Sequence, residues 1–286
     1  MNESNAMSSP TASSARHFHI AFVGGGNMAS AIIGGLVRQG LPGSYIDVVE
    51  PVAEARDKLQ RQWGVLTHEQ PGLALNRAEL VVWAIKPQIF KEAALQARFH
   101  TRNAIHLSVA AGIRTDSIAH WLGSEHIVRC MPNTPALVGK GMTGLFARDA
   151  VTALDRQLVE RVIGTTGEFL WVAQEEQLDA VTALSGSGPA YVFYFLEAMA
   201  QAGADMGLPR EQAYTLAVGT FMGASALAQA SDEPPELLRQ RVTSKGGTTH
   251  AAITSMDQDQ VKILFQRALH AARRRAKELG DEFGAA

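Results

Sequence analysis

Short apolar runs alternate with amphipathic segments through the first half of the chain. The runs lie at residues 19–23, 45–49, 80–85, 104–109 and 126–131. Each is followed closely by glycine, proline, serine or asparagine, which is typical of a buried strand that ends at a turn. Residues 27–39 and 53–63 carry apolar positions at helical spacing. The alternation predicts an α/β fold with a doubly wound parallel sheet, in which ligands bind at the carboxyl ends of the strands.

The second half of the chain follows a helical pattern. Helical segments lie at residues 175–184, 189–206, 210–229, 235–242 and 250–279, the last being either one helix or a broken pair. No strand pattern follows residue 173, so we expect an α/β domain at residues 17–173 and an all-α domain at residues 174–286. Small residues such as Gly203 and Gly219 let these helices approach closely. Their apolar content exceeds what one small domain buries, which predicts an oligomer.

The composition argues against several classes of protein. The chain has 286 residues, of which 46% are hydrophobic and 19% charged, as in soluble globular proteins. The net charge is -2, and the short basic run at residues 273–275 fits a solvated helix face, so no nucleic-acid partner is expected. No apolar run reaches the length of a transmembrane helix, so no membrane partner is expected either.

The lone cysteine and the first residues bear on the compartment and on the start of the fold. Cys130 cannot form an internal disulfide, which favours a reducing compartment and a cytoplasmic location. Residues 1–16 are expected to be a tag remnant and a disordered N-terminus, with Met7 as the natural start. No metal site is predicted.

A glycine loop at residues 24–29, with the sequence GGGNMA, follows the first predicted strand and opens the first predicted helix. Gly24 permits a tight turn, Gly26 lets a pyrophosphate approach the backbone, and Ala29 allows the helix to pack on the strand. In this strand–loop–helix setting the pattern predicts a dinucleotide site with the phosphates at the helix N-terminus.

A second loop, at residues 243–249 with the sequence TSKGGTT, precedes another helix that we expect to begin at His250. Two glycines flanked by hydroxyl groups can aim several N–H and O–H donors at one point, which is typical of an anion receptor. We call this segment the receptor loop. An alternative interpretation is that Thr249 merely caps the helix. A dinucleotide loop and a receptor for a small acid together predict an enzyme that brings a dinucleotide cofactor and a small acid together in one site.

The motifs occur in an order that resembles the pyrroline-5-carboxylate reductase family. They are GGGNMA at 24–29, AIKP at 84–87, SVAAGI at 108–113, MPNTP at 131–135, SGSGPAY at 185–191 and SKGGTT at 244–249. The resemblance extends from about residue 18 to about residue 280. Many members have proline where Lys245 stands. The resemblance implies an N-terminal Rossmann-like domain and a C-terminal all-α dimerisation domain.

The resemblance also implies a reaction, which is the reduction of 1-pyrroline-5-carboxylate to L-proline by hydride transfer from NAD(P)H. It implies cofactor-binding roles for Gly24, Gly26, Asn27, Met28, Ala29, Glu50, Ala84, Lys86, Pro87, Ala110, Gly112 and Asn133. It implies that Ser244, Gly246, Gly247, Thr248 and Thr249 bind the substrate, with Thr249 beside the ring nitrogen. A threonine hydroxyl is a poor general acid, so we expect Thr249 to orient an already protonated imine. Family members form homodimers, sometimes assembled as decamers.

The choice of cofactor depends on Glu50, which ends the second predicted strand. A carboxylate there can accept both ribose hydroxyls of NADH and repel the 2′-phosphate of NADPH. The family generally uses NADPH, and Arg56 or Lys58 can offset the repulsion if either reaches the phosphate. We therefore expect NADPH as the cofactor and NADH as an alternative. Glu50 can also point to solvent and decide nothing.

Some alternatives stay open at this stage. The segment from Ser185 to Pro189 is either an interdomain turn or a wall of the active-site cleft. Asp232 or Glu233 matches a family position that braces the receptor loop, and the sequence does not say which. Rival functions are a β-hydroxyacid dehydrogenase, which needs a catalytic lysine that the segment after Ser185 lacks, and a non-catalytic dinucleotide sensor, which does not need the receptor loop.

Overall fold

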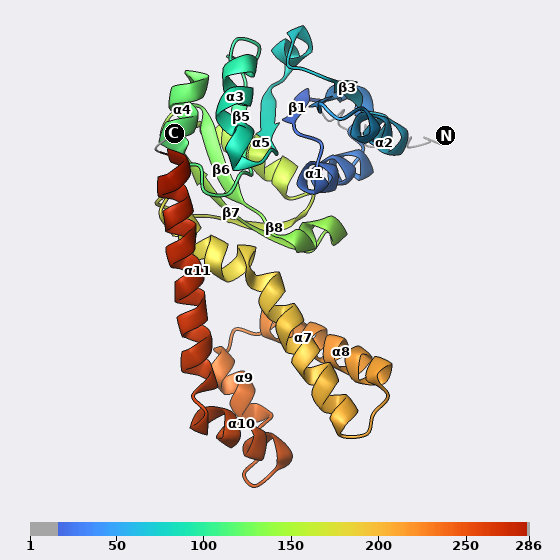
Figure 1. Cartoon of the computed structure of the whole chain (residues 1–286), viewed down its shortest axis with the longest axis vertical. Helices are drawn as coiled ribbons and strands as arrows, with labels where there is room; N and C mark the ends of the chain where they lie inside the picture. Colours follow the sequence, from blue (N-terminus) through green and yellow to red (C-terminus); the bar gives the residue numbers. More distant parts are fainter. Residues whose placement is uncertain (1–16, 285–286) are drawn as a thin grey trace, which may run out of the picture.

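The computed structural model describes residues 17–284 of the chain, so the tag remnant expected at residues 1–16 lies outside the described residues. Its first half contains one sheet in the strand order β3-β2-β1-β4-β5-β6-β7-β8 (Figure 1). The strands are β1 Ile20–Val23, β2 Ile46–Val49, β3 Leu66–His68, β4 Leu80–Trp83, β5 Ile105–Ser108, β6 Ile127–Met131, β7 Gly141–Ala147 and β8 Gly167–Trp171. This arrangement confirms the Rossmann-like fold class.

The sheet is not parallel throughout, because β7 runs antiparallel to β6 and β8 runs parallel to β7. The connection from β6 to β7 covers only residues 132–140. A parallel return needs about a dozen residues or more, so this short connection forces an antiparallel pair. The predicted parallel sheet is therefore present from β3 to β6, where every pairing is parallel, and only the β6–β7 pair at this edge departs from it.

Helices cover both faces of the sheet. They are α1 Asn27–Arg38, α2 Ala53–Trp63, α3 Pro87–Ala97, α4 Thr115–Leu122 and α5 Ala153–Ile163. Alternate residues of each strand point to opposite faces, so Phe22 lies in one buried cluster with Ile32 and Ile33 of α1. Trp83 lies in the other cluster with Phe90 of α3. These clusters fix the strand ends from which the glycine loop emerges.

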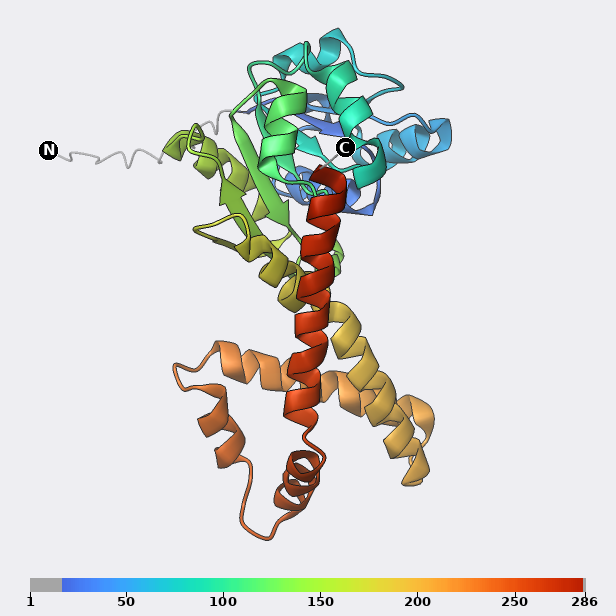
Figure 2. The same ribbon diagram turned by 60° about the vertical axis from the view of Figure 1, so that its left-hand side comes forward.

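The second half of the chain is helical, and in Figures 1 and 2 it extends away from the sheet. Its helices are α6 Gln177–Val181, a π-helical turn at Thr182–Gly186, α7 Gly188–Asp205, α8 Arg210–Gln229, α9 Pro235–Arg241, α10 Thr248–Gln258 and α11 Val261–Gly284. The broken-pair alternative is the correct one, since α10 ends before Gln260, which has a φ of 54°. None of the described helices is long and apolar enough to cross a membrane.

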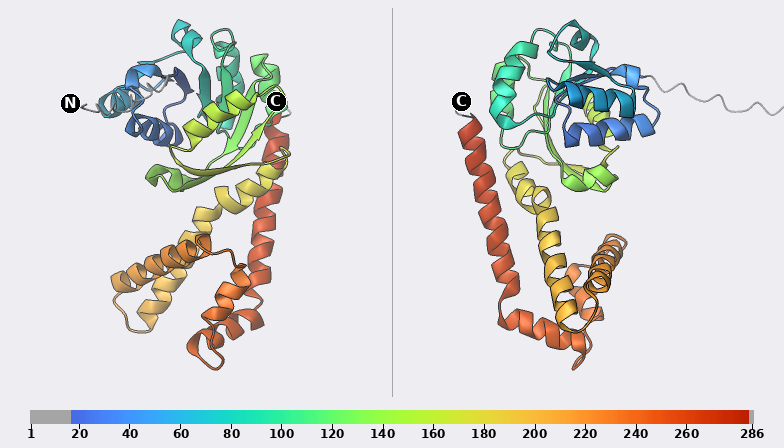
Figure 3. Two further views of the ribbon diagram at one scale, coloured as in Figure 1. Left: turned by 180° about the vertical axis from the view of Figure 1, so that it is seen from behind. Right: turned by 45° about the vertical axis from the view of Figure 1, so that its right-hand side comes forward.

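The last helix, α11, returns to the sheet domain, as both views in Figure 3 show. Its end packs on the loop after β5, because a Cβ on Gly112 would lie 3.2 Å from both Leu279 and Phe283. Arg114 in the same loop pairs with Asp281 at 3.2 Å. The helix therefore links the helical half of the chain to the carboxyl edge of the sheet.

The helices α7 and α8 pack closely on each other and still leave large apolar side chains in solvent. A Cβ on Gly203 would lie 2.6 Å from that of Ala213, so glycine is needed at this crossing. On the outer faces Tyr194, Met222 and Leu227 are about 70% exposed. A single chain thus leaves an apolar surface uncovered, as expected for a protein that associates with copies of itself.

The buried His106 on β5 predicts a dependence of stability on pH. Its Nδ1 accepts a hydrogen bond of 3.2 Å from Trp83 Nε1. Burial, and after it the nearby His126, lowers the pKa of His106 from 6.5 to about 4. The unfolded chain takes up this proton first as the pH falls. The free energy of unfolding should therefore fall by about 2 kcal/mol between about pH 8 and about pH 5 because of this group.

Urea unfolding at both pH values and one protein concentration measures this contribution. His106→Gln should remove it, whereas His126→Gln, at a half-exposed histidine on the neighbouring strand connection, should keep most of it. An unchanged pH dependence in His106→Gln would contradict the assignment.

Candidate active site

Gly24 makes the tight turn that brings the glycine loop across the carboxyl ends of β1, β2 and β4. Its φ is +99°, which favours glycine, and its N–H donates to Val49 O at 2.8 Å. A Cβ on Gly24 would lie 2.4 Å from the carbonyl oxygen of Ala84. Only glycine therefore fits here without moving the backbone of a neighbouring strand end.

The N-terminus of α1 has the features of a phosphate receptor. Gly26 is the capping residue and has no side-chain cap, and the first turn contains no acidic residue. A Cβ on Gly26 would meet no heavy atom within 4 Å, so space is open in front of the helix. Behind it, Ala29 is fully buried against the sheet. The N–H groups at Asn27 and Met28 can therefore face an anion, and the residues present fit a dinucleotide pyrophosphate.

The other expected cofactor residues follow strands that lie next to β1. Ala84 follows β4, Lys86 precedes the first residue of α3, which is Pro87, and Ala110 and Gly112 follow β5. Because β1, β4 and β5 are parallel neighbours, these residues share one edge of the sheet with the glycine loop. Gly112 is covered on one side by the end of α11. The structure thus brings most of the expected cofactor residues to one edge.

Asn133 is held by bonds within the chain. Its Nδ2 donates to Ser185 O at 3.2 Å and Oγ at 3.3 Å, and its Oδ1 accepts from Met142 N at 2.9 Å. These bonds tie the end of β6 to the turn before α7. Asn133 and Ser185 also line a groove of about 510 Å³. The Ser185 segment thus bridges the two halves of the chain, and its place in the wall of an active-site cleft stays a prediction.

The receptor loop begins α10 two residues earlier than expected. Gly247 is the capping residue, and Thr248 and Thr249 are the first residues of the helix. The capping position belongs to a glycine, so Thr249 is not the cap. Among the described residues the hydroxyls of Ser244, Thr248 and Thr249 have no hydrogen-bond partner, and Thr249 is half-buried. Together with the N–H groups at the start of α10, they form an open set of donors.

Glu233 is the acidic residue with a contact that can steady the receptor loop. It pairs with Arg241 at the end of α9, and its N–H donates to Ser231 Oγ at 3.1 Å. Asp232 is exposed. The geometry therefore favours Glu233 in the bracing position that the sequence left open.

The two loops do not meet within one chain. In Figures 1 and 2 β1 and α1 lie in the sheet domain, whereas α9 and α10, which flank the receptor loop, lie at the far end of the helical half. The site that the sequence predicts as one unit is thus divided into two parts of the same chain.

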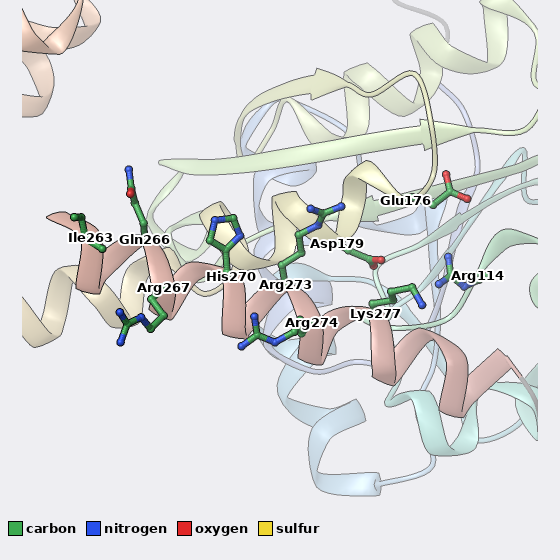
Figure 4. A pocket seen from close by; sticks show the side chains of 10 residues that line it. All are labelled: Arg114, Glu176, Asp179, Ile263, Gln266, Arg267, His270, Arg273, Arg274 and Lys277. Atoms are coloured by element: carbon green, nitrogen blue, oxygen red, sulfur yellow. The ribbon is translucent and has the colours of Figure 1, made fainter.

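A groove of about 650 Å³ beside α11 does not combine the two parts either. Figure 4 shows its walls, in which Arg273 of α11 extends on the side of Asp179 of α6, whereas Arg267 points away from it. Asp179 is buried, which raises its pKa, and the charges of Arg129, Arg114 and Arg273 oppose the rise. The groove contains no residue of the glycine loop or the receptor loop. No group of metal-ligating side chains occurs among residues 17–284.

Comparison with known proteins accounts for both halves of the chain. Residues 175–279 match the family model for pyrroline-5-carboxylate reductase dimerisation, and residues 19–112 match that for NADP oxidoreductase, coenzyme F420-dependent. The pyrroline-5-carboxylate reductase of Pseudomonas aeruginosa is 42% identical, with 93% of this chain and 98% of that protein covered. That of Arabidopsis thaliana is 35% identical, with 93% and 97% covered.

Solved structures agree with the sequence relatives. A pyrroline-5-carboxylate reductase from Coxiella burnetii superposes with a TM-score of 0.87 at 38% identity, covering 92% of this chain and 99% of that one. The Plasmodium falciparum pyrroline carboxylate reductase with NADP bound has a TM-score of 0.82 at 26% identity, covering 92% and 98%. The dimerisation match further indicates that the chain forms a homo-oligomer. On this evidence the chain belongs to the pyrroline-5-carboxylate reductase family.

Proposed function

We propose that the chain reduces 1-pyrroline-5-carboxylate to L-proline, with NADPH as the hydride donor and NADH as an alternative. The observation that carries the proposal is the receptor loop, which offers free hydroxyls and the open N-terminus of α10. These donors suit the carboxylate of a small cyclic imine. The family match and the open N-terminus of α1 support the dinucleotide. We place the activity in the cytoplasm, in keeping with the buried free thiol of Cys130.

The residues act mainly by binding and orientation. The bound nicotinamide supplies the hydride for the imine carbon. Ser244, Thr248 and the N–H groups of Gly246 and Gly247 hold the substrate carboxylate. Thr249 lies in the first turn of α10 and orients the ring nitrogen, which carries its proton before the reaction. The α1 N-terminus and the glycine loop hold the pyrophosphate.

We further propose that each active site combines the glycine loop of one subunit with the receptor loop of its partner. The separation of the two loops within one chain supports this arrangement. The exposed apolar side chains of α7 and α8, within the matched dimerisation region, support a homodimer built through these helices. Five such dimers can assemble further into a decamer, as the resemblance implies.

Oxidation of NADPH in the presence of 1-pyrroline-5-carboxylate tests the function. We expect substrate-dependent loss of NADPH absorbance and formation of proline. A folded protein that binds NADPH and oxidises none of it with this substrate would refute the proposal, and activity with a β-hydroxyacid instead would support the rival reductase class.

Thr249→Ala should lower kcat/KM for the imine by roughly ten- to a hundredfold and leave NADPH affinity unchanged. The lost hydroxyl contact to a charged ring corresponds to about 1.5–3 kcal/mol of transition-state binding. Steady-state kinetics and a fluorescence titration with NADPH measure the two effects separately.

Thr254→Ala is the matched control, because Thr254 lies on the same helix and its hydroxyl bonds to His250 O at 2.8 Å. It should keep the wild-type kcat/KM. Equal behaviour of the two variants would show that Thr249 has only a helical role.

A further inference from the structure

Asp179 of α6 is a buried carboxylate in the wall of the groove beside α11. The residue is only 5% exposed, and it lines the groove opposite α11 (Figure 4). Among residues 17–284 its carboxylate has neither a hydrogen bond nor an ion pair. A buried carboxylate without a donor is unfavourable. This wall of the groove therefore favours a ligand that brings a positively charged donor.

Two cations that line the groove with Asp179 are already paired with another carboxylate. Arg114 and Lys277 both pair with Asp281, at 3.2 Å and 3.3 Å. Burial raises the pKa of Asp179, and the charges of the neighbouring arginines act against this rise and favour the ionised form. These cations thus support the charge of Asp179 and leave its oxygen atoms free to accept from a ligand.

The α11 wall of the groove supplies cations that have no partner in the described part of the chain. They are Arg267, Arg273 and Arg274, and Arg273 extends on the side of Asp179. Four arginines and one lysine in the lining outnumber its two carboxylates by three charges, and the paired Asp281 outside the lining lowers this excess to two. The groove as a whole therefore favours a ligand of net negative charge.

The groove lies on a different face of α11 from the apolar surface of the chain. Phe265 and Leu269 line apolar grooves beside α7, whereas Gln266 and His270 line this one. Consecutive residues of a helix are rotated by about 100°, so the two sets point in different directions. A homodimer built through the apolar faces of α7 and α8 does not need to cover this groove.

We propose that this groove binds an acidic amino acid. The ammonium group of the ligand pairs with Asp179, its α-carboxylate pairs with Arg273, and its second carboxylate lies among the other cations of α11. Asp179 selects for the ammonium group, because a simple dicarboxylate would place a like charge beside it. The volume of about 650 Å³ holds such a molecule together with water. The inference does not depend on the proposed function, since the groove contains no residue of the glycine loop or the receptor loop.

Three small molecules that differ by one group test this site. L-Aspartate carries an ammonium group and two carboxylates, succinate lacks the ammonium group, and L-asparagine has an amide in place of the second carboxylate. Isothermal titration calorimetry of the full chain without dinucleotide gives the affinity for each. We expect L-aspartate to bind at least about tenfold more tightly than the other two. Absence of saturable L-aspartate binding, or equal affinities for the three molecules, would overturn the proposal.

Variants on the two walls of the groove should change these affinities in different ways. Asp179→Asn should weaken L-aspartate binding at least about tenfold and strengthen succinate binding, because it removes a charge that attracts ammonium and repels carboxylate. Arg273→Gln, at an exposed position, should weaken both. Arg275→Gln is the matched control, because Arg275 lies on the same helix, pairs with Glu278 and Glu282 and does not line the groove. It should change neither affinity.

A further control separates this groove from the receptor loop, which also offers donors to a carboxylate. The combined variant Ser244→Ala, Thr248→Ala and Thr249→Ala should keep the wild-type affinity for L-aspartate. Loss of L-aspartate binding in this variant, with unchanged binding in Arg273→Gln, would place the ligand at the receptor loop and overturn the proposal. Urea unfolding checks that each variant is folded, and Arg273→Gln decides the matter if Asp179→Asn does not fold.

Discussion

Two inactive variants of the chain should restore activity when they are produced together in one cell. The first carries Gly24→Ala in the glycine loop, and the second carries Ser244→Ala, Thr248→Ala and Thr249→Ala in the receptor loop. If each site takes one loop from each subunit, a mixed dimer contains one intact site and one doubly altered site. Equal production gives mixed dimers in half of the pairs, so we expect about a quarter of the wild-type activity.

The expected restoration follows from the separation of the two loops. In a dimer of one variant both sites contain the same altered loop, whereas a mixed dimer has one site in which both loops are intact. The fraction does not depend on whether dimers assemble further, because each site needs only one pair of subunits. Each variant produced with a differently tagged copy of itself is the control and should stay inactive. Activity of the mixture no greater than the sum of these controls would show that each chain builds its site alone.

Gly24→Ala should itself lower NADPH affinity by about a hundredfold or more. The added Cβ would lie 2.4 Å from the carbonyl oxygen of Ala84, which belongs to the backbone and cannot rotate away. The glycine loop must then move. A shift of about 1 Å in a group that positions a ligand can weaken its contribution to binding or catalysis about a hundredfold. The positive φ at this position adds strain. Fluorescence titration with NADPH measures the affinity, and urea unfolding measures the accompanying loss of stability.

Gly40→Ala separates the steric effect from the strain. Gly40 has a φ of +94°, close to that of Gly24, but a Cβ there would meet nothing within 4 Å. Its variant should lose about 1–2 kcal/mol of stability and keep its NADPH affinity. Equal affinities of the two variants would contradict the close packing of the glycine loop on Ala84.

The parts of the fold that could be predicted from the sequence have local patterns. The runs that became β1, β2, β4, β5 and β6 are mostly apolar because both faces of these strands are covered. Their polar residues, which are Asp47, His106, Ser108 and Arg129, are buried as well. The strand β7 was missed because Gly141 and Gly144 interrupt its apolar pattern. A Cβ on Gly144 would lie 2.8 Å from Val181 of α6, so a tertiary contact excludes a larger residue there. The three residues of β3 are too few to give a pattern.

In the candidate site, too, the features with a local sequence pattern could be predicted and those set by tertiary structure could not. The glycine and receptor loops were predicted because each has its own short motif. Their separation could not be predicted, since a motif carries no information on distances between segments. The bonds of Glu50 to Gly25 and Val52 were also missed, because the same carboxylate at the end of a strand can face a ribose, a backbone or solvent. The tertiary structure decides among these and places the carboxylate on the N–H groups of Gly25 and Val52.

The long helix α11 sets a fixed span between two working parts of the molecule. Its 24 residues form a rod of about 36 Å, which starts beside α10 and ends on the loop that contains Gly112. Adding or removing one residue within it shifts one end by about 1.5 Å and turns it by about 100° relative to the other. A length change in α11 would therefore misalign the contacts of Gly112 and the orientation of α10 at once. Homologous chains should vary freely in the connection between α7 and α8 and keep the length of α11 constant.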